Sequence, residues 1–197
     1  MAKGLTTIAT TIAIRIAAIA LALTVTLSAN AGDCYTADAE SGELRFSGDV
    51  EGNAFQGHFR QFDVSLCMVG DDPSTAEIRV SVATASATVG NRQGDEALKE
   101  DELFAVDRFP EAVWTSTELV AANDGWRAEG ELDLRGMTAS QPVELQLAGE
   151  DDGFRLTGTA EILRLDYQVG IGEFEDTDFI RNQISLTFDL ILKPESL

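Results

Sequence analysis

One histidine and two cysteines are the side chains here best suited to catalysis, redox chemistry or metal binding. His58 lies in the stretch Gln56-Gly57-His58-Phe59, which predicts a strand just after a turn. A hydrolytic relay would need a partnered nucleophile, and the sequence contains no Gly-x-Ser-x-Gly element. A single histidine also excludes a multi-histidine metal site. We therefore expect a structural or surface role for His58, and an enzyme built around it is our third hypothesis.

Cys34 and Cys67 are far apart in the sequence and do not form a Cys-x-x-Cys pair, which argues against a redox or zinc site. If residues 43–50 and 55–68 form a hairpin that turns near Gly52-Asn53, Cys34 falls within a few residues of Cys67. In an exported chain this favours a disulfide. A pair of free thiols is the alternative.

Acidic residues dominate the composition, with 34 Asp and Glu against 14 Lys and Arg and a formal net charge of −20. Such a charge argues against binding to nucleic acid or to an anionic membrane surface. The clusters at 95–102 and 173–178 lack the spacing of a calcium loop, so we expect charged loops there. With no phosphate loop or dinucleotide fingerprint either, we expect no metal and no cofactor.

Residues 1–31 have the features of an export signal. An apolar run from Ile16 to Leu27 follows Arg15, and the Ala29-x-Ala31 pattern predicts cleavage before Gly32. The alternative is a retained anchor, but the run is shorter than the roughly 20 residues of a spanning helix. We therefore expect one periplasmic domain, residues 32–197, without stable membrane insertion after signal cleavage. A homodimer and an inner-membrane protein partner are left open.

Alternating apolar residues predict about eight strands joined mostly by short turns, and hence an all-β antiparallel fold. The ranges are 43–50, 62–68, 78–82, 113–120, 126–134, 143–147, 154–162 and 184–192. Eight strands can close into a barrel that holds packed side chains or one small ligand. A two-sheet sandwich is the competing architecture. Gly158 and Ala160 favour a cavity by leaving space on an inward face, although a tight strand crossing would also need small residues.

Two long connections interrupt the strands. The stretch 90–117 predicts a short helix between the early and middle strands, and its apolar residues are expected to plug one barrel end: Leu98, Leu103, Phe104 and Phe109. The second connection, 166–182, carries Tyr167, Ile171, Phe174 and Phe179 and is a candidate for the other rim or a lid. Arg164, just before it, is either a polar contact for a ligand or part of an outward salt bridge.

Four segments of the chain, in order, carry a family resemblance that extends roughly from Tyr35 to Lys193. The first contains Asn91, Asp95, Leu98, Glu102-Leu103-Phe104, Phe109-Pro110 and Trp114-Thr115-Ser116-Thr117. The others are Gly130-Glu131-Leu132-Asp133-Leu134-Arg135-Gly136-Met137-Thr138, Gln141-Pro142-Val143 and Arg164-Leu165-Asp166-Tyr167. Together they resemble the YceI-like proteins. The resemblance implies an exported, lipocalin-like barrel associated with binding polyisoprenoid chains.

Three positions depart from the family pattern. Gly94 and Ala97 stand where an Arg and a His are usual, and Gln141 stands where a Lys is usual. If those residues help to hold a charged head group, this chain should prefer a less anionic ligand. The two cysteines are not a general family feature either.

The sequence and the resemblance together predict a non-enzymatic binding protein. Its barrel would hold a polyisoprenoid, an isoprenoid quinone or a fatty amide for carriage or sequestration. The alternative is a β-sandwich interaction or envelope stress-response module without an internal ligand. The expected cavity residues are Val80, Val82, Leu98, Phe104, Phe109, Trp114, Leu132, Leu134, Leu145, Leu147, Gly158, Ala160, Ile162, Arg164, Tyr167, Leu186 and Phe188.

Overall fold

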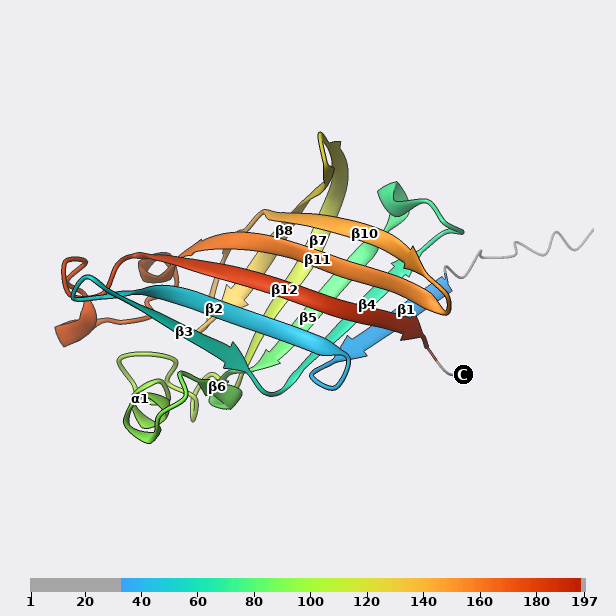
Figure 1. Cartoon of the computed structure of the whole chain (residues 1–197). Helices are drawn as coiled ribbons and strands as arrows, with labels where there is room; N and C mark the ends of the chain where they lie inside the picture. Colours follow the sequence, from blue (N-terminus) through green and yellow to red (C-terminus); the bar gives the residue numbers. More distant parts are fainter. Residues whose placement is uncertain (1–32, 196–197) are drawn as a thin grey trace, which may run out of the picture.

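The computed structural model of the chain describes residues 33–195, so the predicted signal peptide, residues 1–31, lies outside the described residues. Twelve strands form one sheet (Figure 1). In chain order they are β1 (Asp33–Asp38), β2 (Gly42–Val50), β3 (Asn53–Phe59), β4 (Phe62–Met68), β5 (Glu77–Ala83), β6 (Ala87–Thr88), β7 (Glu111–Ala122), β8 (Gly125–Leu134), β9 (Met137–Ser140), β10 (Val143–Glu150), β11 (Gly153–Leu163) and β12 (Gln183–Pro194).

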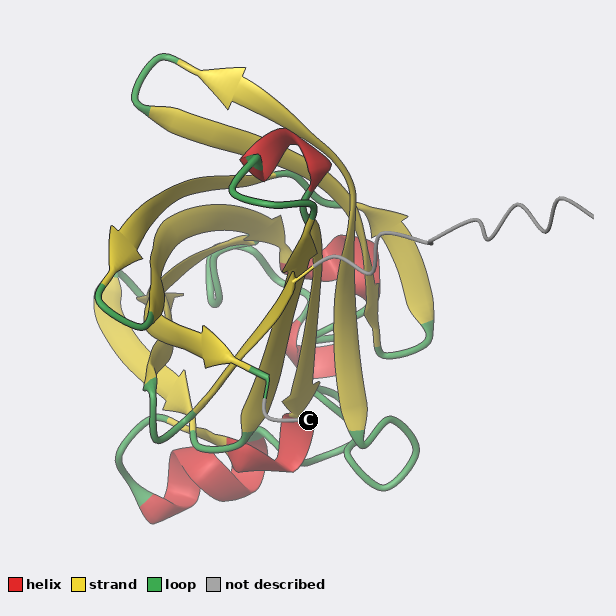
Figure 2. Cartoon of the chain, turned by 90° about the vertical axis from the view of Figure 1, so that its right-hand side faces the viewer, coloured by secondary structure: helices red, strands yellow, loops and turns green. Residues whose placement is uncertain are grey.

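Eight of these strands close into an antiparallel barrel in the order β1, β4, β5, β7, β8, β10, β11 and β12. The ring closes where β1 meets β12, through the pairs Tyr35↔Pro194 and Thr36↔Lys193. Figure 2 shows the strands curving round in a ring. The barrel confirms the predicted fold class and shows that the sandwich alternative is wrong.

The number of barrel strands agrees with the prediction, but one member differs. The predicted strand 43–50 is β2, which pairs with β12 on one side and β3 on the other and lies outside the ring. The ring strand that was not predicted is β1, which pairs with β4 along its whole length. Its six residues carry little alternation, so its extended state depends on its neighbours rather than on its own pattern.

The hairpin after β2 also differs from its prediction. The turn falls at Glu51-Gly52, where both residues have positive φ, but the arm predicted as 55–68 is two separate strands. β3 pairs with β2, and beyond Arg60-Gln61 the chain crosses to pair as β4 with β1. The small strand β6 then pairs with β3 at His58 and Phe59 and extends the wall.

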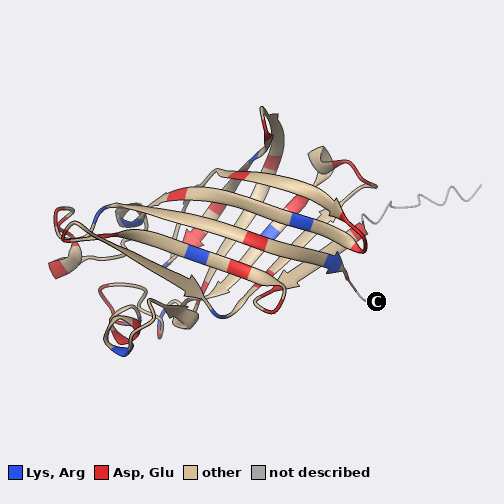
Figure 3. Ribbon diagram, in the orientation of Figure 1, with Lys and Arg blue, Asp and Glu red and all other residues tan. Residues whose placement is uncertain are grey.

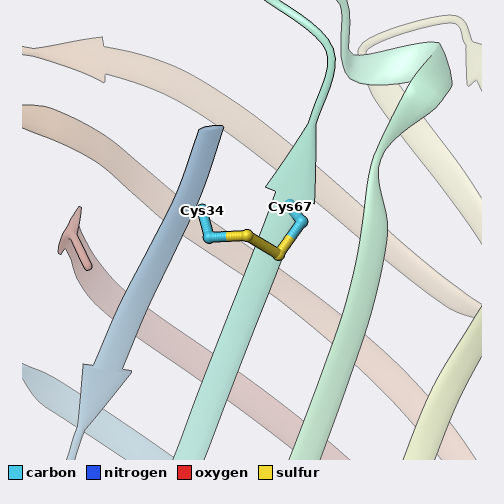
Figure 4. Close-up of a disulfide and its surroundings, with 2 residues drawn as sticks. All are labelled: Cys34 and Cys67. Atoms are coloured by element: carbon cyan, nitrogen blue, oxygen red, sulfur yellow. A yellow bond between two sulfur atoms is a disulfide. The ribbon is translucent and has the colours of Figure 1, made fainter. Parts of the chain in front are cut away.

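The predicted disulfide is present, and it joins β1 to β4 directly (Figure 4). Cys34 and Cys67 are register partners in that ladder, with their Cα atoms 4.1 Å apart. The predicted reason, a hairpin of 43–50 with 55–68, was therefore wrong, while the pairing itself is confirmed. We call this end of the barrel the disulfide end and the opposite end the loop end.

The disulfide end is packed solid. Leu66, Met68 and Leu192 are almost completely buried, with 0–1% of their surface exposed. The rings of Tyr35 and Phe154 meet edge to face beside them, with centroids 4.8 Å apart. This core rests on β1 and β12, which form the seam of the barrel, and on their neighbours β4 and β11.

The described helices are short. α1 (Arg92–Ala97) lies between β6 and β7, as predicted, and the Asn91 side chain caps it by accepting the Gly94 N–H at 2.9 Å. Four 3₁₀ turns complete the described helical structure: η1 (Pro73–Thr75), η2 (Thr84–Ser86), η3 (Arg164–Tyr167) and η4 (Gly172–Phe174). No helix within residues 33–195 has the length and apolar character needed to cross a membrane.

We expect the double variant Cys34→Ser/Cys67→Ser to be less stable by about 3–4 kcal/mol, because the disulfide closes a long loop in the unfolded chain. Guanidinium unfolding of the variant and of the oxidised protein measures the difference. Reducing the unmodified protein with dithiothreitol is the control and should lower its stability by a similar amount. An unchanged unfolding midpoint in both would contradict the prediction.

Candidate ligand-binding cavity

An internal cavity of about 770 Å³ occupies the barrel between its packed core and the loop end. Because successive side chains of a strand point to opposite faces, alternate residues of most ring strands line it. On β5 these are Ile78, Val80 and Val82, and on β12 they are Ile184, Leu186, Phe188 and Leu190. Asn91 and Gln93 line the cavity and are themselves exposed, so the cavity reaches the surface beside α1.

Thirteen of the seventeen residues predicted for the cavity line it. They are Val80, Val82, Leu98, Phe104, Trp114, Leu132, Leu134, Leu145, Ala160, Ile162, Arg164, Leu186 and Phe188. For the ten that lie in strands, the place on the wall follows from strand alternation together with closure of the ring, whereas Leu98, Phe104 and Arg164 lie in the two long connections. Their role in binding a ligand stays a prediction.

Four predicted residues lie off the cavity. Leu147 is on the inward face of β10, but it pairs with Leu156 nearer the disulfide end, where it packs against the solid core. At Gly158 the ring of Phe188 covers the backbone, only 2.3 Å from where a side-chain carbon would be. The chain therefore presents Phe188, not Gly158, to the cavity.

The other two corrections are aromatic residues in the long connections. Tyr167 lies in η3 and is 2% exposed, because it packs into the hydrophobic core. Burial and, to a lesser extent, the negative charge of Asp166 raise the pKa of Tyr167 above its ordinary value. Phe109 packs outside the cavity between Gly136 and the Arg108 guanidinium, which lies 5.5 Å from the ring centroid.

Sequence reasoning missed an aromatic cluster on the cavity wall that β2 and β3 supply. The ring of Phe46 lies 5.1 Å from that of Phe59 and 6.3 Å from that of Phe55. Phe59 in turn lies 6.3 Å from Phe104 in the loop after α1. All four residues line the cavity. The alternation of Leu44, Phe46 and Val50 was a usable signal, but the wrong hairpin left the faces of β2 and β3 unassigned.

The two long connections meet at the same end of the barrel. The backbone N–H groups of Gly170 and Ile171 both donate to the carbonyl oxygen of Glu102, at 2.8 and 3.0 Å. Phe174 and Phe179 stack on each other, with centroids 6.3 Å apart, and line the cavity there. The second connection is therefore not the opposite rim. It joins the first in covering the loop end.

Arg135 holds these two connections together from the turn after β8. Its side chain is 5% exposed, and it donates through Nη1 to the Gln168 carbonyl at 2.6 Å and through Nη2 to the Asp101 carbonyl. Burial lowers the pKa of the Arg135 guanidinium, and the nearby positive charge of Arg108 lowers it further. The guanidinium still carries its charge at neutral pH, so the two bonds are charge-assisted.

Arg164 has a comparable role within the second connection. It is 3% exposed, and four of its N–H groups donate to backbone carbonyls. Nη1 reaches Val169 and Gly170 at 2.9 and 3.0 Å, while Nε reaches Arg181 at 3.1 Å and Nη2 reaches Ile180 at 2.6 Å. Its burial lowers its pKa. Of the two alternatives for Arg164, the outward salt bridge is wrong, because the side chain is buried, bonds to backbone carbonyls and borders the cavity.

Asp95 fixes α1 against the barrel. Its carboxylate accepts from the Thr88 hydroxyl and from the Val89 N–H, each at 2.8 Å, and from Arg60 at 2.9 Å. The hydrogen bond from Thr88 and then that from Val89 hold the pKa of Asp95 below its ordinary value, with a smaller contribution from Arg60.

The three departures from the family pattern all border the cavity, since Gly94, Ala97 and Gln141 are part of its lining. Arg164 is the charged residue of that lining, and the other polar members are Gln56, Thr84, Asn91, Gln93 and Gln141. His58 is exposed and is not among them. Within residues 33–195, no three His, Cys, Asp or Glu side chains are grouped so that they could hold a metal ion.

A closed eight-stranded antiparallel barrel with an apolar interior and one covered end is the architecture of a small-ligand-binding barrel. Comparison with known families makes the assignment specific, because the model of the YceI-like domain matches residues 35–192. The chain therefore belongs to the YceI-like family.

Individual relatives agree with this assignment. The chain is 27% identical over 124 residues to a UPF0312 protein of Pectobacterium atrosepticum, covering 59% of this chain and 65% of that protein. It is 30% identical over 96 residues to the protein YceI of Salmonella arizonae, covering 49% of this chain and 50% of that protein. The matched region thus spans between half and two thirds of these relatives.

Solved structures show the same fold. BcnA of Burkholderia cenocepacia matches with a TM-score of 0.75 and 18% identity, over 79% of this chain and 98% of that one. A polyisoprenoid-binding domain of Saccharophagus degradans, implicated in plant cell wall breakdown, matches with a TM-score of 0.62 and 15% identity. That match covers 83% of this chain and 99% of the other.

We expect Arg135→Met to lower the free energy of unfolding by about 2 kcal/mol, because it removes two charge-assisted hydrogen bonds to carbonyls of the loop end. Amide hydrogen exchange should also become faster at Gly170 and Ile171. Arg108→Met, which changes an exposed arginine of the same segment, is the control and should stay within about 0.5 kcal/mol of the unmodified protein. Equal protection of these two amides from exchange in both variants would contradict the proposed role of Arg135 in holding the two connections together.

The lowered pKa of Asp95 predicts a pH-dependent contribution to stability. Because its folded-state pKa lies below the unfolded value, its contribution is present above the ordinary aspartate pKa and is lost as the pH falls through the folded-state pKa. Asp95→Asn should therefore be less stable than the unmodified protein at pH 7, and this difference should shrink in acid. Urea unfolding of both proteins across that range tests it, and a pH-independent difference would refute it.

Proposed function

We propose that this chain binds one long amphiphilic lipid inside its barrel, for carriage or sequestration, and that it acts without catalysis. The observation that carries the proposal is the cavity of about 770 Å³, whose lining is aliphatic and aromatic apart from a few side chains. Each methylene that leaves water for such a wall contributes about 0.8 kcal/mol, so a long chain gains affinity along its length. The volume lies in the range of small-molecule sites.

A polyisoprenoid, an isoprenoid quinone or a fatty amide fits this cavity chemically, because each combines a long apolar chain with a small polar group. The polyisoprenoid-binding domain of Saccharophagus degradans, which has the same fold, supports the first of these classes. We also propose export to the periplasm through residues 1–31, on the strength of the cleavage pattern in the sequence. A soluble carrier there would shield the chain from water.

The acidic exterior supports a soluble carrier. Figure 3 shows Asp and Glu spread over both the strands and the loops. Several acidic residues pair across the outer face, as Asp189 does with Arg155 and Glu144 with Arg127. The outer face is thus charged while the inner face is apolar, which keeps the filled barrel soluble.

Native mass spectrometry of the protein purified from the periplasm of its own cells tests the proposal. We expect a bound mass that matches an intact amphiphile, released by organic extraction and identified by fragmentation. Repeated recovery of ligand-free protein, together with no uptake of polyprenols, quinones or fatty amides in vitro, would refute the proposal.

A cavity-filling variant gives an independent prediction. Ala160 lies on β11 and borders the cavity, so Ala160→Phe should occupy part of the space and weaken lipid binding at least about tenfold. Thr159→Phe, at the exposed neighbouring position, is the matched control and should leave binding unchanged. Titration of a fluorescent long-chain lipid measures both affinities, and equal affinities would place the ligand elsewhere.

A further inference from the structure

Gln141 places an amide inside the barrel wall, where β9 ends and β10 has not yet begun. Its backbone N–H donates to the Gly130 carbonyl at 2.8 Å, and its backbone carbonyl accepts from Trp114 Nε1 at 2.8 Å. The residue is 6% exposed and lines the cavity. Backbone and neighbours therefore hold this side chain in a fixed position.

The orientation of the Gln141 amide is set by its partners. Nε2 donates to the carbonyl oxygens of Pro142 and Glu161, each at 3.0 Å. Both partners are acceptors, so only the NH₂ group of the amide can face them. The remaining atom, Oε1, is consequently the one turned away from the wall.

Oε1 of Gln141 has no donor among the described residues. Within residues 33–195, Arg135 Nε is the side-chain nitrogen or oxygen atom that is fully buried and has no hydrogen-bond partner. Gln141 Oε1 is therefore not fully buried, and open space lies next to it. Because the residue is buried and borders the cavity, we infer that Oε1 faces the cavity. An acceptor that faces an apolar cavity gains a hydrogen bond when the occupant beside it supplies an O–H or N–H.

The other buried polar residues of the cavity lining, Thr84 and Arg164, already have partners, whereas Gln56, Asn91 and Gln93 are exposed. The Thr84 hydroxyl donates to the Phe109 carbonyl at 2.7 Å, and four N–H groups of Arg164 are bonded to carbonyls. An anionic group at Gln141 would meet the lone pairs of Oε1 with no donor beside it. Phosphate and carboxylate groups are therefore disfavoured at this point.

We propose that the cavity selects an uncharged amphiphile whose polar group, a hydroxyl, phenol or primary amide, donates a hydrogen bond to Gln141 Oε1. This inference rests on the proposed lipid-binding function and specifies the head group and the residue that recognises it. The polar end of the ligand then lies inside the barrel beside β9 and β10, and its chain lies against the apolar wall.

Three ligands with one tail test this directly: geranylgeraniol, its methyl ether and geranylgeranyl phosphate. Binding is measured by the fluorescence of Trp114, whose indole N–H donates to the Gln141 backbone carbonyl, or by competition with a fluorescent lipid. We expect the alcohol to bind about tenfold more tightly than the ether, which cannot donate, and the phosphate to bind more weakly still. This comparison needs only the unmodified protein.

Variants then assign the effect to one atom. Gln141→Leu should remove the preference for the alcohol over the ether while ether binding changes by less than about threefold. Gln141→Lys should instead improve binding of the phosphate, because it adds a cation at that position. Gln146→Leu, which changes an exposed glutamine of β10 outside the cavity lining, is the matched control and should keep the full preference.

The outcomes separate the two proposals. Equal binding of alcohol and ether by the unmodified protein, or a preference that survives Gln141→Leu, overturns the role of Gln141 and leaves lipid binding intact. Tight binding of the phosphate by the unmodified protein overturns the selection for an uncharged group. Failure of all three ligands and of the fluorescent lipid to bind overturns the proposed function together with this inference.

Discussion

Closure of the barrel is the constraint on which the rest of this structure depends. A sheet that closes has no free edge along its ring, and its two faces become an inside and an outside. Here the seam between β1 and β12 is only two residue pairs long. The full-length ladder between β1 and β4, with the Cys34–Cys67 disulfide across it, supports that short seam. The apolar residues that face inward from the ring strands owe their position to this closure.

Much of the fold could be predicted because the alternation of apolar and polar residues within each strand is visible in the sequence. β12 shows this best, since Ile184, Leu186, Phe188 and Leu190 alternate in the sequence and all line the cavity. β1 could not be found this way, because its state depends on a partner strand whose pairing is not local. The same limit explains Gly158, since only the structure shows that Phe188 lies over it.

The roles of the buried arginines were also beyond local patterns. A charged residue in a sequence is normally expected at the surface, yet Arg135 and Arg164 are almost fully buried. Their partners are backbone carbonyls of residues 101, 168–170 and 180–181, and any residue type supplies a carbonyl. Only the positions of those carbonyls in space identify the arginines as clamps. Gln141 is similar, because the direction of its amide follows from the carbonyls of Pro142, just before β10, and Glu161 on β11.

The backbone carbonyl of Glu102 accepts hydrogen bonds from the N–H groups of both Gly170 and Ile171. This shared acceptor bears on how fast a ligand could enter or leave the cavity. Two segments about seventy residues apart in the sequence share one acceptor, so neither can lift from the barrel without releasing the other. For the proposed lipid, a route past this cover would require both segments to open in one event. The residence time along that route would be governed by the frequency of that opening, so that two lipids of different affinity would leave at similar rates.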